Sequence, residues 1–160
     1  SYSVTGVQTC ALPIYTTAGV LRRLPEIVAG QPAAIFLLIG TNDLPWYTYC
    51  SDSAILNAYE QILAACRAQS PRTQVFVQSI LPRHRSYSRR IQHLNQALQQ
   101  LAGRYGYSFL DLYPRFADSG GGLRREFTND HLHLLAAGYV CWAEVLAPHI
   151  SALMDTACDS

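Results

Sequence analysis

Two short polar stretches carry residue types suited to acid–base and oxyanion chemistry. Asp130 and His133 are three positions apart, so one turn of the chain can direct the carboxylate at an imidazole nitrogen. That contact fixes the imidazole tautomer and stabilises the imidazolium, as a general base requires. Asn42, within the stretch Gly40–Asp43, offers an amide that could donate to an oxyanion. The Asp-x-x-His pattern also fits a plainer alternative, a helix N-cap followed by a surface histidine.

The periodicity of apolar residues predicts alternating helices and strands around these stretches. We expect helices at Thr17–Ala29, Asp52–Ala68, Ser88–Tyr105 and Leu135–Met154, and strands at Ala33–Ile39, Val75–Leu81 and Phe109–Tyr113. The first of these strands is a continuous apolar run, which favours burial on both faces. Such alternation indicates right-handed crossovers and a parallel sheet. Ligands bind beyond the carboxyl ends of such strands, where the polar stretches fall.

The predicted fold is therefore a three-layer α/β/α domain of flavodoxin-like plan. Three strands are fewer than the roughly five that are usual for this plan, and the first element should be a strand. We therefore expect a domain that lacks its N-terminal strand or strands.

Composition narrows the class of protein. The chain has 160 residues, of which 49% are hydrophobic and 14% charged, with a net charge of +1. These values exclude a disordered, collagen-like or coiled-coil chain and disfavour a nucleic-acid partner. The sequence has no apolar run near the roughly 18 to 20 residues of a membrane span. The five cysteines lack metal-ligand spacing, so we expect buried or free thiols and no metal. We also expect no cofactor.

The N-terminal segment differs in character from the rest. Val4–Ile14 reads VTGVQTCALPI and resembles the translation of a common sequencing adapter. We therefore exclude residues 1–14 from fold reasoning as a non-native segment. The expected organisation is that segment, a truncated domain over residues 15–154, and a tail over residues 155–160. Any export signal would lie upstream, so the sequence assigns no compartment.

Four segments resemble the SGNH (GDSL-type) hydrolase family in its carbohydrate-esterase and acetylhydrolase-like branch. IFLLIGTNDL looks like the third family block, and TNDHLHLLAAGYVCWAEVL looks like the fifth. TTAGVLRRL is similar to the stretch after the second block, and VQSILP fits the same branch. These segments are Ile35–Leu44, Thr128–Leu146, Thr16–Leu24 and Val77–Pro82, and the resemblance extends from Thr16 to about Ile150.

This resemblance implies roles for three residues. Asn42 would be the side-chain donor of the oxyanion hole, His133 the general base and Asp130 its partner. The first block, with the nucleophilic serine, and the glycine of the second block have no counterpart, and the sequence contains no Gly-Asp-Ser. Without that serine no acyl-enzyme forms, so we expect this chain to be inactive. His131 stands where the family commonly has glycine.

Gly40, Trp46, Arg85 and Arg89 are predicted substrate-binding residues. Trp46 could line a substrate pocket or be a partly buried packing residue. Arg83, Arg85, Arg89 and Arg90 could hold an anionic group near a helix start, or form a solvated loop.

The expected function is serine-type hydrolysis of a small acyl ester, with acetyl favoured and a carbohydrate as a candidate alcohol. The predicted partner is thus a small molecule, with neither nucleic acid nor membrane, and the oligomeric state is unassigned. One alternative is a non-catalytic fragment or carbohydrate-binding remnant. Another is a phosphate- or nucleotide-binding α/β module, which the lack of a glycine-rich loop after a strand disfavours.

Overall fold

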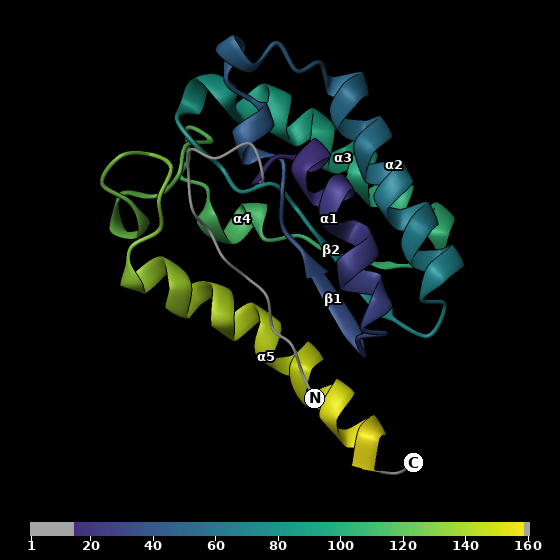
Figure 1. The fold of residues 1–160 in the computed structure, drawn as a ribbon. Coiled ribbons are helices and arrows are strands. Elements are labelled where there is room, and N and C mark those ends of the chain that lie inside the picture. The colour runs from purple at the N-terminus through teal and green to yellow at the C-terminus, as the bar shows by residue number, and fades with distance from the viewer. Residues whose placement is uncertain (1–14, 159–160) are drawn as a thin grey trace. The chain divides into compact units, whose positions relative to one another are not determined.

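A computed structural model describes residues 15–158, so the adapter-like segment lies outside the described residues. The helices are α1 (Thr17–Ala29), α2 (Asp52–Gln69), α3 (Ser88–Tyr105), α4 (Tyr113–Phe116) and α5 (Ala136–Cys158), and the strands are β1 (Ala34–Leu37), β2 (Gln74–Gln78) and β3 (Ser108–Leu110) (Figure 1). They fall into two compact units. The first contains the described chain up to Ile80 together with Arg90–Asp111, and the second contains Leu81–Arg89 and the chain from Leu112 onward.

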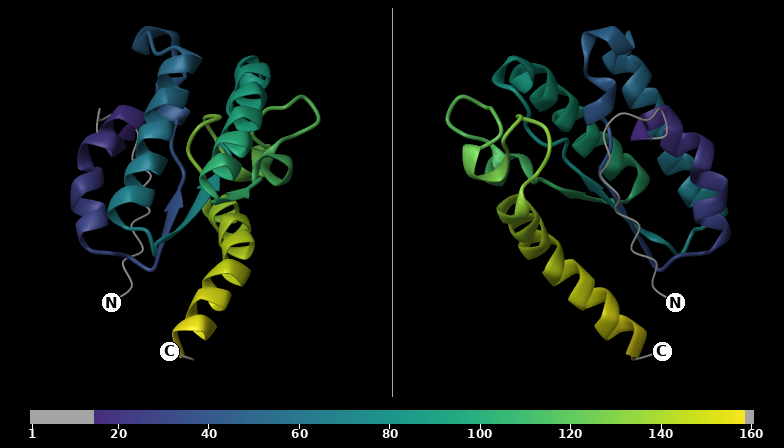
Figure 2. Two further views of the ribbon diagram at one scale, coloured as in Figure 1. Left: turned by 90° about the vertical axis from the view of Figure 1, so that its right-hand side faces the viewer. Right: turned by 60° about the vertical axis from the view of Figure 1, so that its left-hand side comes forward.

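The first unit is built on a parallel sheet with the strand order β1-β2-β3. Phe36 on β1 pairs with Phe76 on β2, and their rings stack at 4.6 Å between centroids. The crossover helices α2 and α3 lie on one face of the sheet, with α1 beside α2, as right-handed connections between successive strands require (Figure 2). The predicted α/β class, with a three-stranded parallel sheet, is confirmed.

The strands are shorter than the sequence predicts. The run expected over Ala33–Ile39 forms a strand only at Ala34–Leu37, and of its residues only Leu37 is buried. The prediction of burial on both faces is therefore wrong for β1, because this strand is at the outside of the described sheet and has one described neighbour. The other strands also end early, at Gln78 and Leu110, and Tyr113 begins α4 instead of ending a strand.

The helices follow their sequence signals closely. The side chains of Thr16 and Ser51 accept hydrogen bonds from Gly19 N and Ala54 N, both at 3.1 Å, and so cap α1 and α2. Pro25 lies inside α1, which continues to Ala29. The core between the helices and the sheet consists of fully buried side chains, chiefly Ile55, Tyr59, Ile62, Leu63, Val77, Ile91, Leu94 and Leu98.

The second unit contains loops, α4 and the long helix α5. Phe116 at the end of α4 packs against Phe127, with ring centroids 5.2 Å apart. A loop closes where Leu123 N donates to Arg83 O at 2.8 Å. Helix α5 runs through Pro148 to Cys158, beyond the expected end at Met154. None of the helices within residues 15–158 combines the length and the apolar character needed to cross a membrane.

Candidate functional site

The second unit brings Asp130 and His133 together. His133 Nδ1 lies 2.5 Å from Asp130 Oδ2, in the loop that precedes α5. The other carboxylate oxygen, Oδ1, accepts from the backbone N–H groups of His133 at 2.8 Å and of Leu132 at 3.0 Å. Between them, His131 has a φ of 60°, the left-handed conformation that glycine adopts at lower cost. The predicted pair thus forms within one tight turn, with its ring orientation set by the carboxylate.

The electrostatics of this turn favour an ionised Asp130. The hydrogen bond from the His133 side chain, followed by the one from the His133 backbone, holds the Asp130 pKa well below its usual range. Both side chains are about half exposed, so a ligand could reach the imidazole. A carboxylate that accepts from Nδ1 leaves Nε2 as the unprotonated nitrogen of a neutral imidazole, which is the arrangement a general base needs.

Asn42 lies in the first unit, on a turn directly after β1. Gly40 enters this turn with a φ of 113°, and a Cβ at this position would approach Ile80 Cδ1 to 2.9 Å. Only glycine meets both demands without strain. The turn Thr41–Asp43 is a short 3₁₀ helix, and within it Asn42 Nδ2 donates to Tyr15 O at 3.3 Å. Since an amide nitrogen carries two hydrogens, Asn42 has a second donor for an oxyanion.

Asp43 is a structural residue of this turn that the sequence reasoning missed. It is buried, and its carboxylate accepts from Thr17 N at 3.0 Å and from Thr17 Oγ1 at 2.9 Å. Burial raises the Asp43 pKa above its usual value, against the lowering effect of the Thr17 bonds. The carboxylate therefore ties the start of α1 to the turn that carries Asn42. The polar Thr16-Thr17 pair at the helix start was the available signal.

The predicted substrate-binding residues have different environments. Gly40 is buried beneath Ile80, so its observed role is the turn itself. Arg85 and Arg89 are exposed in the second unit. Trp46 is also exposed, so the alternative that it is a packing residue is wrong. Contact of any of these residues with a substrate remains a prediction.

Arg90 does not belong to the solvated basic loop in which the sequence placed it. Its guanidinium bonds to Asp52 Oδ1 at 2.6 Å and to the carbonyl oxygens of Leu44 and Cys50, each at 2.7 Å. Arg83 stacks over the Tyr87 ring, 4.9 Å from its centroid. The sequence could not separate these arginines, because the partners of Arg90 are about 40 residues away along the chain.

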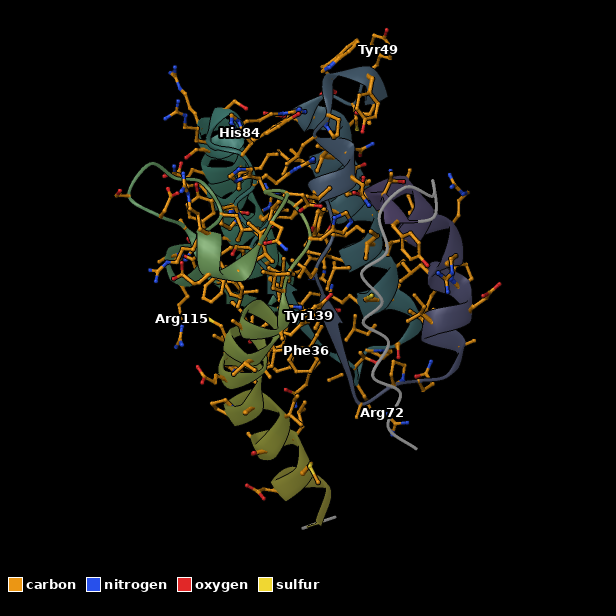
Figure 3. The ribbon with its side chains drawn as sticks, turned by 90° about the vertical axis from the view of Figure 1, so that its left-hand side faces the viewer. Phe36, Tyr49, Arg72, His84, Arg115 and Tyr139 are labelled. Carbon is orange, nitrogen blue, oxygen red and sulfur yellow. The ribbon has the colours of Figure 1, made fainter. Side chains whose placement is uncertain are left out.

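The histidines do not form a metal centre within the described chain. The rings of His84 and His131 meet edge to face at 5.6 Å, and His84 is marked in Figure 3. Nowhere in residues 15–158 do three or more His, Cys, Asp or Glu side chains gather around a point that could hold a metal ion.

Comparison with known proteins identifies a family. The sequence profile of the GDSL-like lipase/acylhydrolase family matches residues 2–140. A Streptococcus pneumonia structure, provisionally described as a platelet activating factor, is 32% identical, with a TM-score of 0.74 over 85% of this chain and 68% of that one. No curated protein matches the chain.

Two further solved structures share the fold. A GDSL-like lipase from Bacteroides thetaiotaomicron has a TM-score of 0.78 and 20% identity, over 87% of this chain and 72% of that one. A carbohydrate esterase of family 3 from Talaromyces cellulolyticus has a TM-score of 0.71 and 20% identity, over 89% and 70%. At this identity the likeness concerns the fold alone.

Proposed function

Because the chain belongs to the GDSL-like lipase/acylhydrolase family, we propose that Asp130, His133 and Asn42 are its acid–base pair and oxyanion donor for ester hydrolysis. The observation that carries this proposal is the 2.5 Å contact between His133 Nδ1 and Asp130 Oδ2. It leaves Nε2 available to accept a proton, and a surface histidine after an N-cap would need no such contact.

Each residue has a defined step in the proposed reaction. His133 Nε2 accepts the proton of an attacking hydroxyl group and later returns it to the leaving alcohol. The ionised Asp130 carboxylate stabilises the imidazolium formed between these steps. The amide hydrogen of Asn42 that does not bond to Tyr15 O donates to the oxyanion of the tetrahedral intermediate, an interaction whose loss typically costs about 10²- to 10³-fold in rate.

The lack of a counterpart to the family's nucleophilic serine limits the activity expected of this chain. The 160 residues contain no Gly-Asp-Ser, so we expect no acyl-enzyme from this chain alone. Loss of one triad member in serine proteases leaves only about 10³- to 10⁴-fold acceleration over water. The same absence favours our second candidate, a non-catalytic fragment or carbohydrate-binding remnant.

For the substrate, we propose a small acyl ester, with an acetylated carbohydrate as the favoured case. Support comes from the fold shared with a carbohydrate esterase and from the segments that resemble the acetylhydrolase-like branch. Arg85 and Arg89, both exposed, could contact an anionic group on such a substrate. Replacing both with Gln in an active form should then weaken hydrolysis of anionic esters more than that of neutral ones.

Hydrolysis of p-nitrophenyl acetate by the purified chain tests the proposal, with His133→Ala as the variant and His93→Ala, an exposed histidine on α3, as the matched control. A rate that only His133→Ala removes would support the acid–base role and would mean that another group replaces the missing serine. Equal rates at background level would favour the non-catalytic candidate, provided that circular dichroism shows a folded chain. A rate above background that survives His133→Ala would contradict the proposal.

A second measurement tests the pair without requiring turnover. In a nitrogen-detected NMR experiment, we expect neutral His133 to carry its proton on Nδ1 in the wild type. In Asp130→Asn the side-chain amide can donate to Nδ1, so the population should move toward the Nε2-protonated tautomer. An unchanged tautomer would show that Asp130 does not orient the ring.

A further inference from the structure

The loop Leu44–Cys50 presents a dense group of exposed aromatic side chains. Trp46 is 78% exposed, Tyr47 64% and Tyr49 88%, and all three fall within four consecutive residues. Figure 3 shows Tyr49 at the outer tip of this loop, pointing away from the ribbon. Scattered exposed apolar residues are ordinary on a protein surface, but a contiguous group marks an interaction site.

Arg90 holds both ends of this loop. Its NH1 group donates to the carbonyl of Leu44 and its NH2 group to the carbonyl of Cys50, each at 2.7 Å. Its Nε group donates to Asp52 at the start of α2 at 2.6 Å. Charge-assisted hydrogen bonds of this length are the strong class, and the planar guanidinium fixes three acceptors at once. One side chain of α3 therefore determines the span of the loop.

The interior of the loop is fixed as well. Thr48 Oγ1 lies 2.6 Å from Pro45 O and 2.8 Å from Asp43 O, which links the loop to the turn that carries Asn42. Tyr49 adopts a positive φ of 50°. The rings of Trp46 and Tyr47 meet at 80° with centroids 6.0 Å apart. The aromatic side chains thus project from a backbone that is ordered before any ligand arrives, which lowers the entropic cost of binding.

We propose that Trp46, Tyr47 and Tyr49 form a binding platform for a neutral oligosaccharide, which would present the sugar part of an ester to the Asn42 turn. Presentation of an ester to the Asn42 turn rests on the proposed ester hydrolysis, whereas binding of the oligosaccharide does not. Leu44–Cys50 contains no charged residue, so the platform suits an uncharged ligand.

The chemistry of the exposed groups favours a sugar over a lipid surface. Each exposed aromatic side chain has an apolar ring with a polar tip, an indole N–H or a phenol O–H. A pyranose ring has a matching division between an apolar C–H face and a rim of hydroxyl groups. Lipid-inserting segments add aliphatic side chains and basic residues, but the aliphatic Leu44 of this loop is only 1% exposed.

Isothermal titration of the 160-residue chain with xylohexaose, which carries no ester, tests the platform separately from hydrolysis. We expect saturable binding, weakened about tenfold by Tyr49→Ala and by Trp46→Ala because each loses one stacked ring. Tyr139→Ala, at an exposed tyrosine on α5, is the matched control and should bind as the wild type does. Arg90→Gln should weaken binding as well, although Arg90 presents no ring to the ligand, and Arg90→Lys should not restore it.

Three results would overturn the platform. The first is no saturable binding at millimolar xylohexaose by a chain that circular dichroism shows to be folded. The second is binding to phosphatidylcholine vesicles that Tyr49→Ala abolishes while xylohexaose has no effect, which would identify a lipid surface. The third is a dimer in light scattering that Tyr49→Ala dissociates, which would make the loop a contact between copies. Oligosaccharide binding without any ester hydrolysis would support the platform and count only against the enzymatic proposal.

Discussion

Replacement of Asn95 by alanine would test how the chain just after β2 is held beside the Asn42 turn. The Asn95 side chain on α3 forms hydrogen bonds with both backbone polar groups of Ile80. Its Oδ1 accepts from Ile80 N at 2.7 Å, and its Nδ2 donates to Ile80 O at 3.0 Å. Ile80 is 1% exposed and Asn95 7%, so water does not reach these groups in the wild-type chain. Ile80 is also the residue whose side chain limits the space at Gly40.

Asn95→Ala would leave the N–H and C=O groups of Ile80 without their side-chain partner, and this determines the expected loss of stability. Each buried polar group left without a partner costs about 1 to 3 kcal/mol, partly relieved where a water enters the space left by the side chain. We therefore expect Asn95→Ala to lower the free energy of unfolding by about 2 to 4 kcal/mol. Asn95→Asp keeps an acceptor for Ile80 N–H but places a carboxylate oxygen against Ile80 O in a buried site, so at neutral pH it should also be less stable than the wild type.

Urea unfolding followed by far-ultraviolet circular dichroism provides the assay. Gln96→Ala is the control, because Gln96 is exposed on the next position of α3 and reports the gain in helix propensity that any alanine brings. A difference between Asn95→Ala and this control below about 0.5 kcal/mol would refute the argument that Asn95 holds Ile80.

Three further predictions concern the turn that carries Asn42 and the pair of Asp130 and His133. Gly40→Ala should destabilise the chain by more than about 1 kcal/mol in the same urea assay, because alanine at a φ of 113° is strained and meets Ile80. An unchanged midpoint would contradict this. Burial raises the folded pKa of Asp43. The contribution of Asp43 to the free energy of unfolding should therefore be greatest below the unfolded pKa of 3.8 and be lost as pH rises through the folded pKa. We therefore expect the free energy of unfolding of the wild type to rise relative to that of Asp43→Asn as pH falls through the acidic range. A difference between the two that does not change with pH would contradict the role given to Asp43. The folded pKa of Asp130 is depressed, so its bond to His133 should persist above 3.8 and be lost only as pH falls below the ordinary range. Carbon-detected NMR of the Asp130 carboxyl would show this, and a midpoint at the ordinary value would refute it.

The sequence predicted the helices better than the strands. The predicted ranges of α1 and α3 agree with the structure at both ends. A helical stripe of apolar residues marks both helices, and the Thr16 cap marks the start of α1. The strand ranges were too long, because an apolar run does not reveal where pairing with a neighbour stops. Ala34–Leu37 pairs with Gln74–Val77, and the apolar Leu38 and Ile39 lie beyond the end of β1.

Local spacing also limited what could be predicted of the site. The Asp130–His133 contact was predictable because both residues lie in one turn. The bond from Thr17 to Asp43 spans 26 positions, and the bond from Arg90 to Leu44 spans 46. Residue type can mark one partner of such a contact, as Thr16-Thr17 does at the start of α1, but it does not identify the distant partner, because tertiary packing decides which residues meet. The catalytic and substrate-binding roles remain predictions for the experiments above.

The manner in which Arg90 holds the aromatic loop has a consequence for how specificity could diverge. Both loop ends are bound through main-chain carbonyl groups, those of Leu44 and Cys50, so the bonds do not depend on the side chains between them. Substitutions at Trp46, Tyr47 or Tyr49 could therefore exchange one ligand preference for another while the scaffold and the Asn42 turn stay as they are. If the loop binds a ligand as proposed, we expect that a different loop of equal length between the carbonyls of Leu44 and Cys50 would change the ligand bound without changing the rest of the domain.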